Sequence, residues 1–386
     1  MRIPTTSFTL ALLLVACGTA ATDVGEAVAQ GASAQAPITA EQPFAAKDFI
    51  ETQVARFDSP WAMTPAPGGG FLVTEKAGTL KYLPAGANAL ARTVVGVPKV
   101  DAAGQGGLMD VVFRPGTDML YLSYSEGGAG GKGVVLARAR FVQDAKTGPR
   151  LDNVETLFRT PKVDGNGHYS GRIAFAPDGH LFFTAGERQK FDPAQDPKLT
   201  LGKVLRLTAD GKPAPGNPLA TKGFDPAVWT YGHRNLLGIA FDAKGNLWEQ
   251  EMGPKGGDEL NLILPGRNYG YPLVSNGDHY DGRPIPDHPT RPDLEAPKAS
   301  WNPVISPAGL MIYSGALFPA WRGNAFIGGL SSKALVRVAI DGTTAREAAR
   351  YDMGARIREV EQGPDGAVYV LEDGPNARLL RLTPKP

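Results

Sequence analysis

The stretch from residue 165 to residue 188 combines the side chains that proton abstraction requires. It places His168 in a glycine-rich loop that reads GNGHYSGR, and Glu187 follows after one short predicted strand. Because an imidazole titrates near neutral pH and a carboxylate can orient it, we interpret His168 as a general base and Glu187 as its partner. An idle histidine is the alternative, because loops also carry histidines without a chemical role. The stretch indicates an enzyme.

Two motifs offer hydrogen-bond donors to a planar or anionic ligand. Gln105 stands between glycines in GQGG, where the missing side chains let a ligand lie close to the backbone. Arg234 and Asn235, in YGHRN, set a guanidinium beside an amide, which suits a carboxylate or a quinone oxygen. A plain turn explains each motif taken alone.

Three cations late in the chain form a third candidate set. Arg356 and Arg358 are two residues apart, so on a strand both guanidiniums point to one face. Lys333 precedes them in GLSSKA. Three cations directed at one channel would hold a polyanionic small molecule, whereas ordinary surface charge is the alternative.

A fourth motif offers oxygen ligands to a metal ion. Gly253 and Pro254 lie in EMGPKGGDE, which ends at Glu259, and Tyr269 follows ten residues later. A carboxylate with backbone carbonyls from a Gly/Pro loop suits Ca²⁺, and the chain has no Cys/His cluster that would suit Zn²⁺. A solvated acidic turn is the alternative.

The elements that must position these motifs are β-hairpins. Six segments repeat a short apolar strand, a turn built on glycine and a second strand, and they span residues 60–74, 111–123, 173–184, 239–248, 310–328 and 360–371. Hairpins recurring at such intervals without a helical period predict an all-β, six-bladed β-propeller with four-stranded antiparallel blades. A β-sandwich is the alternative. In a propeller, loops from every blade meet at the mouth of the central channel, so distant motifs can form one site.

The N-terminus predicts export. Residues 1–17 carry one positive charge, a short apolar run and a lipobox-like LVAC that ends at Cys17, the cysteine that becomes lipidated in bacterial lipoproteins. Because Gly18 rather than aspartate follows, we expect a periplasmic protein anchored to the outer membrane. An ordinary signal peptide cut near residue 20 is the alternative. Residues 18–43 read as a flexible tether, and residues 44–386 hold the propeller, whose first strand should begin near Phe49.

Composition narrows the possible partners. The 386 residues carry a formal net charge of +1, so no charge field indicates a nucleic acid. One cysteine excludes a disulfide within the chain. No Gly-x-Gly-x-x-Gly opens a βαβ unit, which argues against a nicotinamide cofactor. We expect contact with a membrane only through the lipid at Cys17.

Taken together, these motifs resemble those of the glucose/sorbosone dehydrogenase family. The specific ones are GQGG at 104–107, YGHRN at 231–235, GDELNL at 257–262 and PGRNYG at 265–270, and the likeness extends over nearly all of residues 49–384. The branch that the chain is most similar to comprises bacterial soluble aldose sugar dehydrogenases, which are six-bladed propellers that use pyrroloquinoline quinone (PQQ) and Ca²⁺.

The resemblance implies a role for each residue. His168 would accept the proton of the anomeric hydroxyl while hydride passes to the C5 carbonyl of PQQ, giving an aldonolactone. Arg234 would polarise the reacting quinone oxygen. In this family an aspartate often stands where this chain has Glu187, which is one methylene longer. The residues that would hold the cofactor are Gln105, Arg234, Asn235, Tyr280, Lys333, Arg356 and Arg358. The residues that would hold calcium are Gly253 and Pro254 at one site and Glu259 and Tyr269, through its carbonyl, at another.

Two other functions remain open at this stage. A calcium-dependent lactonase on a six-bladed propeller would keep a histidine and an acid-rich channel, but it would not need the three late cations. A propeller that only binds carbohydrate or protein would not need His168. For the dehydrogenase, the expected partners are a small aldose substrate and an electron acceptor that the sequence does not identify.

Overall fold

The computed structural model describes Met1, residues 42–86 and residues 88–386, and the described fold belongs to the unit Ala34–Pro386. The predicted signal sequence with Cys17, and all but the last residues of the predicted tether, lie outside the described residues. The first described strand begins at Phe49, where the sequence predicts it.

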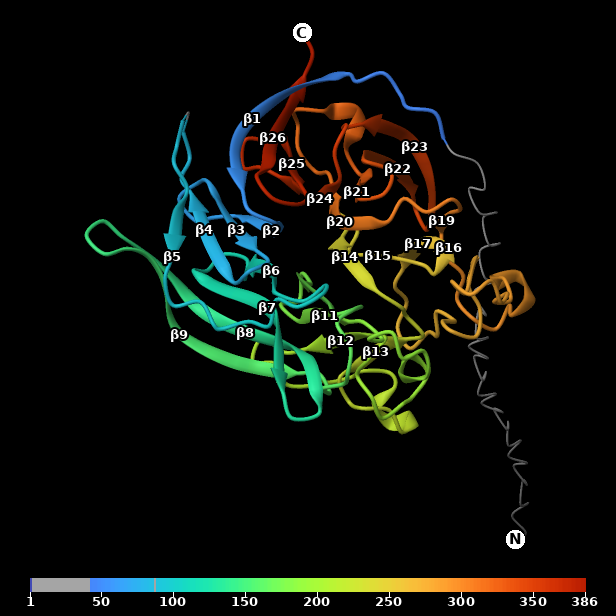
Figure 1. Cartoon of the computed structure of the whole chain (residues 1–386). Coiled ribbons are helices and arrows are strands. Elements are labelled where there is room, and N and C mark those ends of the chain that lie inside the picture. Colours follow the sequence, from blue (N-terminus) through green and yellow to red (C-terminus); the bar gives the residue numbers. More distant parts are fainter. Residues whose placement is uncertain (2–41, 87) are drawn as a thin grey trace. The chain divides into compact units, whose positions relative to one another are not determined.

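The described strands form six antiparallel sheets of four strands each, which are the blades of a propeller (Figure 1). Blade 1 comprises β2 (Pro60–Pro65), β3 (Phe71–Glu75), β4 (Thr79–Leu83) and β5 (Arg92–Val94). Blade 2 comprises β6 (Leu108–Phe113), β7 (Met119–Gly128), β8 (Gly131–Asp144) and β9 (Gly148–Arg159). Blade 3 comprises β10 (Ser170–Phe175), β11 (Leu181–Ala185), β12 (Lys203–Leu207) and β13 (Val228–Tyr231).

The remaining three blades complete the ring. Blade 4 comprises β14 (Leu236–Phe241), β15 (Leu247–Glu251), β17 (Asp258–Leu262) and β19 (Ala299–Trp301). Blade 5 comprises β20 (Pro307–Ile312), β21 (Ala325–Gly329), β22 (Ala334–Asp341) and β23 (Thr344–Asp352). Blade 6 comprises β24 (Ile357–Gln362), β25 (Val368–Glu372), β26 (Ala377–Pro384) and β1 (Phe49–Phe57).

A few short elements lie outside the blades. A two-stranded sheet pairs β16 (Lys255–Gly256) with β18 (Gly277–Asp278). The described helices are single 3₁₀ turns: η1 (Asp192–Ala194), η2 (Ala220–Lys222), η3 (His288–Thr290) and η4 (Pro319–Trp321). Within the described part of the chain, no helix has the length and apolar character to span a membrane.

The two ends of the described fold close the ring. Strand β1 pairs antiparallel with β26, with Phe49 opposite Pro384, so blade 6 is built from both ends of the propeller. The inner strands β2, β6, β10, β14, β20 and β24 each contact the next, and β24 returns to β2. The six hairpins expected from the sequence are the inner pairs of the six blades, and the prediction of a six-bladed propeller is confirmed.

Local chemistry explains the hairpins. In blade 3 the turn between β10 and β11 places Gly179 at a φ of +84°, a conformation that favours glycine, and Gly179 donates to the Ala176 carbonyl at 2.9 Å. The strands on either side are almost wholly buried, because inner strands face neighbouring blades on both sides. The core accordingly lies between adjacent blades and includes Trp248, Trp301 and Trp321, all fully buried.

Each inner strand carries an irregularity near its start. The register between inner strand and neighbour shifts in all six blades within the first residues, for example between Leu108 and Val111 in blade 2 and between Ile357 and Glu359 in blade 6. A bulge turns a side chain away from the regular alternation. Trp61 and Arg358 lie at such shifts and line the cavity described next. The bulges therefore direct side chains from the inner strands into one place.

Candidate active site

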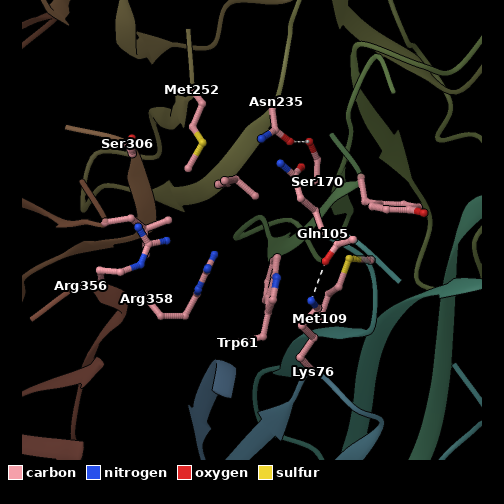
Figure 2. Close-up of a pocket in the computed structure, with 14 residues that line it drawn as sticks. Trp61, Lys76, Gln105, Met109, Ser170, Asn235, Met252, Ser306, Arg356 and Arg358 are labelled. Atoms are coloured by element: carbon pink, nitrogen blue, oxygen red, sulfur yellow. Dashed lines mark hydrogen bonds between the residues drawn. The ribbon is translucent and has the colours of Figure 1, made fainter. Parts of the chain in front are cut away.

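A central cavity of about 330 Å³ lies where the inner strands begin. All six blades or the loops next to them contribute to its wall, as expected for the mouth of a propeller channel (Figure 2). The volume lies within the range of small-molecule sites. The lining residues are Trp61, Lys76, Gly104, Gln105, Met109, Tyr169, Ser170, Asn235, Leu237, Met252, Ser306, Leu330, Arg356 and Arg358.

One wall of the central cavity is cationic. Figure 2 shows Arg356 and Arg358 together on one side of the cavity. Lys76 lies on the other side, near Met109. Both arginines bind the carboxylate of Asp373, Arg356 at 2.8 Å and Arg358 at 2.8 Å. One carboxylate therefore balances two guanidiniums, and the wall keeps a positive charge that suits an anionic ligand.

A side cavity of about 270 Å³ adjoins the central one. The two cavities share a boundary. His168 lines the side cavity, whereas Tyr169 and Ser170 line the central one. Likewise, Arg234 lines the side cavity and Asn235 lines the central one. A molecule in each cavity would meet at His168 and Arg234. The residues of the side cavity are His168, Glu187, Gln189, Phe191, Arg234, Pro254, Tyr271, His279, Tyr280, Asp281 and Arg283.

His168 and Glu187 form a buried pair at this boundary. Nδ1 of His168 lies against one carboxylate oxygen of Glu187, and this oxygen also accepts the backbone N–H of Gln189 at 2.9 Å. The other oxygen of Glu187 accepts the backbone N–H of Phe191 at 2.7 Å. Burial lowers the pKa of His168 and the Arg234 guanidinium adds to this, although Glu187 opposes both. Burial acts to raise the pKa of Glu187, but its hydrogen bonds hold that pKa below the usual value. The pair thus keeps an ionised carboxylate beside a neutral imidazole at neutral pH.

The loop that carries His168 is held by Gln105. The Gln105 side-chain oxygen accepts the backbone N–H of His168 at 2.7 Å, and the Gln105 backbone N–H donates to the Asn166 carbonyl at 2.7 Å. Gly104 makes this approach possible, because a Cβ there would lie 2.3 Å from the Asn166 carbonyl oxygen. Gln105 lines the central cavity as well, so one residue connects that cavity to the loop of the candidate base.

Arg188 holds the same loop from its other side. Its buried guanidinium donates to the carbonyls of Gly167 at 2.8 Å, Gly165 at 2.9 Å and Lys132 at 2.6 Å. It also lies 3.7 Å from the centre of the Tyr169 ring, a cation–π contact. The backbone of this region is strained, since His168 has a φ of +47° and Arg188 a φ of +64°. Such strain persists only where surrounding contacts enforce it and is common at functional sites.

Arg234 is fixed by backbone contacts and keeps one free donor. Its Nη1 donates to the Met252 carbonyl at 2.9 Å, its backbone N–H donates to Glu251, and its carbonyl accepts from Glu187 at 2.9 Å. Its Nε is buried and has no partner among the described residues. Arg234 lines the side cavity, so its guanidinium is placed to donate to an oxygen of a bound ligand. The neighbouring Asn235 lines the central cavity.

The Gly253–Pro254 turn lies at the wall of the side cavity. Asp258 holds it, because one carboxylate oxygen accepts the Gly253 N–H at 2.9 Å while the other accepts from Ile305 at 2.8 Å. Burial raises the pKa of Asp258 to about 7, although these hydrogen bonds act against the rise. Gly253 is required here, since a Cβ would lie 2.2 Å from the Gly257 carbonyl oxygen. The turn therefore presents backbone oxygens in a fixed, glycine-dependent geometry.

Glu259 and Tyr269 lie deeper in blade 4. Glu259 contacts Nε2 of His288 at 3.3 Å and the side-chain amide of Asn261 at 3.3 Å. The Tyr269 hydroxyl donates to the Leu262 carbonyl at 2.6 Å and accepts a backbone N–H, so the ring is anchored inside the fold. Burial raises the pKa of Tyr269. Because the Tyr269 hydroxyl is already hydrogen-bonded, the possible metal ligands of these two residues are the Glu259 carboxylate and the Tyr269 backbone carbonyl.

Comparison with known proteins identifies the family. A family model described as glucose/sorbosone dehydrogenase matches residues 57–381. The chain belongs to this family. It is 36% identical to the aldose sugar dehydrogenase YliI of Escherichia coli over 348 residues, which cover 87% of this chain and 93% of that protein. It is 28% identical to quinoprotein glucose dehydrogenase B of Acinetobacter calcoaceticus, covering 75% of this chain and 67% of that protein.

Solved structures agree with the family assignment. The apo form of the soluble aldose sugar dehydrogenase from Escherichia coli is 35% identical, with a TM-score of 0.81 over 87% of this chain and 100% of that one. The PQQ-bound form of aldose sugar dehydrogenase from Streptomyces coelicolor is 30% identical, with a TM-score of 0.70 over 89% of this chain and 100% of that one. The glucose/sorbosone dehydrogenase fold thus extends over the whole propeller.

Two residues that the family resemblance links to the cofactor lie away from the central cavity in this chain. Tyr280 lines the side cavity and is 74% exposed. Lys333 is exposed, has a φ of +51° and lines neither of the two cavities. The third cation that lines the central cavity is Lys76, on the side opposite Arg356 and Arg358.

Other residues of this glucose/sorbosone dehydrogenase site were not predicted from the sequence. Trp61 and Lys76 line the central cavity, Arg188 holds the His168 loop, and Asp258 holds the Gly253–Pro254 turn. Two local signals were present, because Trp61 opens the first predicted hairpin and Arg188 directly follows Glu187. No local sequence signal marks Lys76, because a lysine directly after a strand is common at protein surfaces.

Proposed function

We propose that this member of the glucose/sorbosone dehydrogenase family is a PQQ- and Ca²⁺-dependent dehydrogenase that oxidises the anomeric carbon of aldose sugars to aldonolactones. One observation carries the proposal. The His168–Glu187 pair and Arg234 lie on the boundary between a cationic central cavity and an open side cavity. That is the arrangement needed to transfer hydride from a sugar in one cavity to a cofactor in the other.

The residues of the central cavity fit PQQ. Its wall combines the guanidiniums of Arg356 and Arg358 with Trp61, so it can pair with carboxylates and cover a planar ring. Arg234 lines the side cavity at this boundary, so its guanidinium would supply a donor for an oxygen there. Bound PQQ would supply the two-electron acceptor that takes the hydride. The PQQ-bound Streptomyces structure, at 30% identity, supports the same assignment.

The donor set of the Gly253–Pro254 turn fits Ca²⁺. It offers hard backbone oxygens in a loop held by Asp258, and Pro254 lies on the cavity wall. Glu259 and Tyr269 are buried, and the Glu259 carboxylate and the Tyr269 carbonyl would supply oxygen ligands at a second site. Bound Ca²⁺ would supply a Lewis acid next to the cofactor.

The chain's own residues supply proton transfer and charge stabilisation. Because Nδ1 of His168 faces the Glu187 carboxylate, Nδ1 carries the proton and Nε2 is free to accept the proton of the anomeric hydroxyl. As the C1–H bond breaks and hydride leaves, a C1=O bond forms and the lactone results. Glu187 stabilises the imidazolium that appears, and Arg234 stabilises negative charge at the boundary.

Reconstitution tests the proposal directly. The purified protein is stripped with a chelator, loaded with PQQ and Ca²⁺, and assayed on a panel of aldoses with an artificial dye acceptor. We expect sugar-dependent dye reduction that requires both additions, and Ca²⁺ but not Zn²⁺ should restore it. Hydrolysis of a lactone in the absence of PQQ would instead identify the lactonase, and full activity of a metal-free preparation would overturn the calcium requirement.

We also propose that the physiological form is a lipoprotein of the outer membrane, anchored through Cys17. The LVAC sequence and Gly18 motivate this location. Several acyl chains, each worth ~0.8 kcal/mol per buried methylene, make such attachment lasting. Fractionation of cells expressing the full chain and its Cys17→Ser variant tests it. Recovery of the unmodified chain only in the soluble periplasm would leave a cleaved signal peptide as the explanation.

A further inference from the structure

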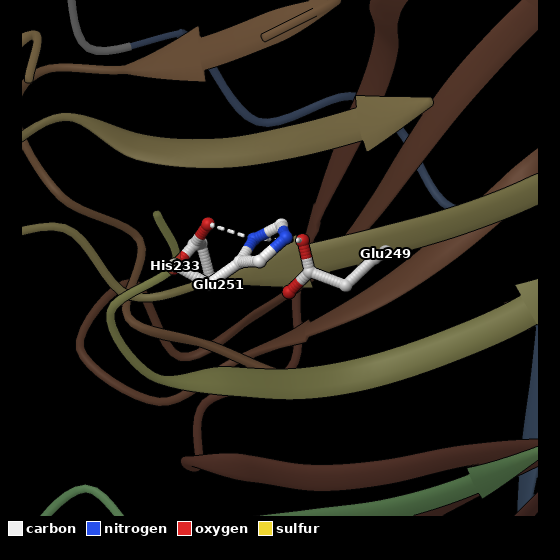
Figure 3. A group of neighbouring side chains, drawn as sticks. All are labelled: His233, Glu249 and Glu251. Carbon is white, nitrogen blue, oxygen red and sulfur yellow. Dashed lines mark hydrogen bonds and ion pairs between the residues drawn. The ribbon is translucent and has the colours of Figure 1, made fainter. Parts of the chain in front are cut away.

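Three buried side chains of types that can bind a metal ion lie together in and beside blade 4, next to Arg234. His233 precedes β14, and Glu249 and Glu251 lie two residues apart on β15 and so face the same side of the sheet. All three are buried, and one ligand atom from each lies within 4.8 Å of the others (Figure 3). The group belongs to neither cavity, since none of the three lines either one.

No lysine or arginine in the described part of the chain forms an ion pair with the carboxylates of this group. Glu259 on β17 lies directly opposite Glu251, so like charges face each other across two paired strands. Among the described residues, the ion pairs of Glu249, Glu251 and Glu259 involve only imidazoles, those of His233 and His288. Burying several carboxylates in this way is costly unless protons or a cation compensate them.

Two buried oxygens at the group have no hydrogen-bond partner among the residues that the structure describes. They are Oε1 of Glu249 and Oδ1 of Asn261, and both residues are fully buried. The amide nitrogen of Asn261 has two protons but lies 3.2 Å, 3.4 Å and 3.3 Å from the carboxylates of Glu249, Glu251 and Glu259. The amide therefore has two protons for three carboxylates, while its oxygen, which points away from them, accepts none. Turning the Asn261 amide over would exchange its nitrogen and oxygen and place Oδ1 among the carboxylates, where a cation would bind it.

We propose that His233, Glu249 and Glu251 bind one divalent transition-metal ion of the Mn²⁺ or Zn²⁺ kind, with Asn261 completing the site through Oδ1. The nitrogen ligand sets this ion apart from Ca²⁺, which prefers oxygen alone. Nδ1 of His233 would bind the metal, because Nε2 lies 2.9 Å from the Thr230 hydroxyl and can donate to it. The His233 ring is already held by stacking on Tyr269, 4.5 Å away.

The distances allow this site with small movements. Nδ1 of His233 lies 3.1 Å from a Glu251 oxygen and 4.0 Å from a Glu249 oxygen. Ligands about 2.1 Å from one ion lie roughly 3 to 4.2 Å apart, so the 4.8 Å maximum must shrink by less than about 1 Å. The other oxygen of Glu251 accepts the backbone N–H of Arg234, so a bound ion would also stiffen the backbone at the cavity boundary.

Direct spectroscopy on the full chain tests the site without relying on activity. The protein is stripped with a chelator, supplied with excess Ca²⁺ to fill oxygen-only sites, and titrated with Mn²⁺. Bound metal is measured by mass spectrometry and its ligands by pulsed electron paramagnetic resonance. We expect one tightly bound Mn²⁺ with directly coordinated ¹⁴N and a rise in Tm with Mn²⁺ concentration. Failure of sugar oxidation would leave this result untouched, because the assay involves neither PQQ nor sugar.

Variants locate the ion. Glu249→Gln keeps the side-chain shape and should weaken Mn²⁺ binding by at least ~100-fold. Glu372→Gln makes the same change at another buried glutamate, which pairs with Arg378, and should leave binding unchanged. Asn261→Asp adds a carboxylate and should tighten binding, which gives an effect opposite to that of misfolding. Absence of ¹⁴N coupling in the wild-type protein, or equal Mn²⁺ affinity in Glu249→Gln, would overturn the proposal.

Discussion

Glu187 and Arg188 are consecutive residues that bind different parts of the loop that carries His168. The Glu187 carboxylate binds the His168 ring, while the Arg188 guanidinium binds the carbonyls of Gly165 and Gly167. One dipeptide after β11 thus fixes both the orientation of the candidate base and the path of the backbone that carries it.

Replacing His168 should remove the base and leave the cofactor site intact. We expect His168→Ala to lower kcat by at least ~10²-fold, the range that general-base catalysis contributes, with PQQ affinity within a few-fold of the parent. His180→Ala is the matched control, because His180 lies in the turn between β10 and β11 and lines neither cavity. A kcat within a few-fold of the parent would remove His168 from the mechanism.

The pH profile should report the buried imidazole. His168 accepts a proton only when neutral, and burial lowers its pKa, so activity should fall with decreasing pH only below about 6.5, the ordinary value. Glu187→Gln removes the group that raises this pKa, so the acid limb of kcat/KM should move to still lower pH while kcat drops at least ~10²-fold. Glu187→Asp keeps the charge and should retain more activity. An acid limb that shifts upward in Glu187→Gln would contradict this assignment.

Arg188 should act by positioning the loop rather than by contact with substrate. Arg188→Met leaves three carbonyls without their donor, and each charge-assisted hydrogen bond contributes about 1.5–3 kcal/mol. We expect the free energy of unfolding to fall by at least ~2 kcal/mol and kcat to fall more than KM changes. Arg159→Met, which removes an exposed pair with Glu126, serves as the control and should alter neither. Unchanged kcat in Arg188→Met would show that the loop holds its shape without the arginine.

Arg358 and Lys333 should differ in their effect on PQQ affinity. Arg358 lines the central cavity and Lys333 does not. Arg358→Ala should therefore weaken PQQ binding by about 1.5–3 kcal/mol, measured by titration of the apoprotein, whereas Lys333→Ala should cost well under half of that. Equal losses in the two variants would mean that Lys333 reaches the cofactor in the loaded protein.

The sequence by itself determined the blades. Strand patterns and turn glycines such as Gly179 and Gly366 are local, because a glycine at positive φ between two apolar segments specifies a hairpin wherever it stands. Six such hairpins predicted the inner pairs of all six blades. The spaced motifs then indicated the family, and the match of the family model to residues 57–381 confirms it.

Only the tertiary structure decided which side chains meet. Gln105 reaches the His168 backbone across 63 residues, and a local pattern carries no information about such a distance in space. The same holds for Lys76, which joins the cavity wall from blade 1 while Lys333 stays outside it. The group around His233, Glu249 and Asn261 could likewise be recognised only in the structure. The pairing of β15 with β17 brings together buried polar atoms that lie apart in the sequence.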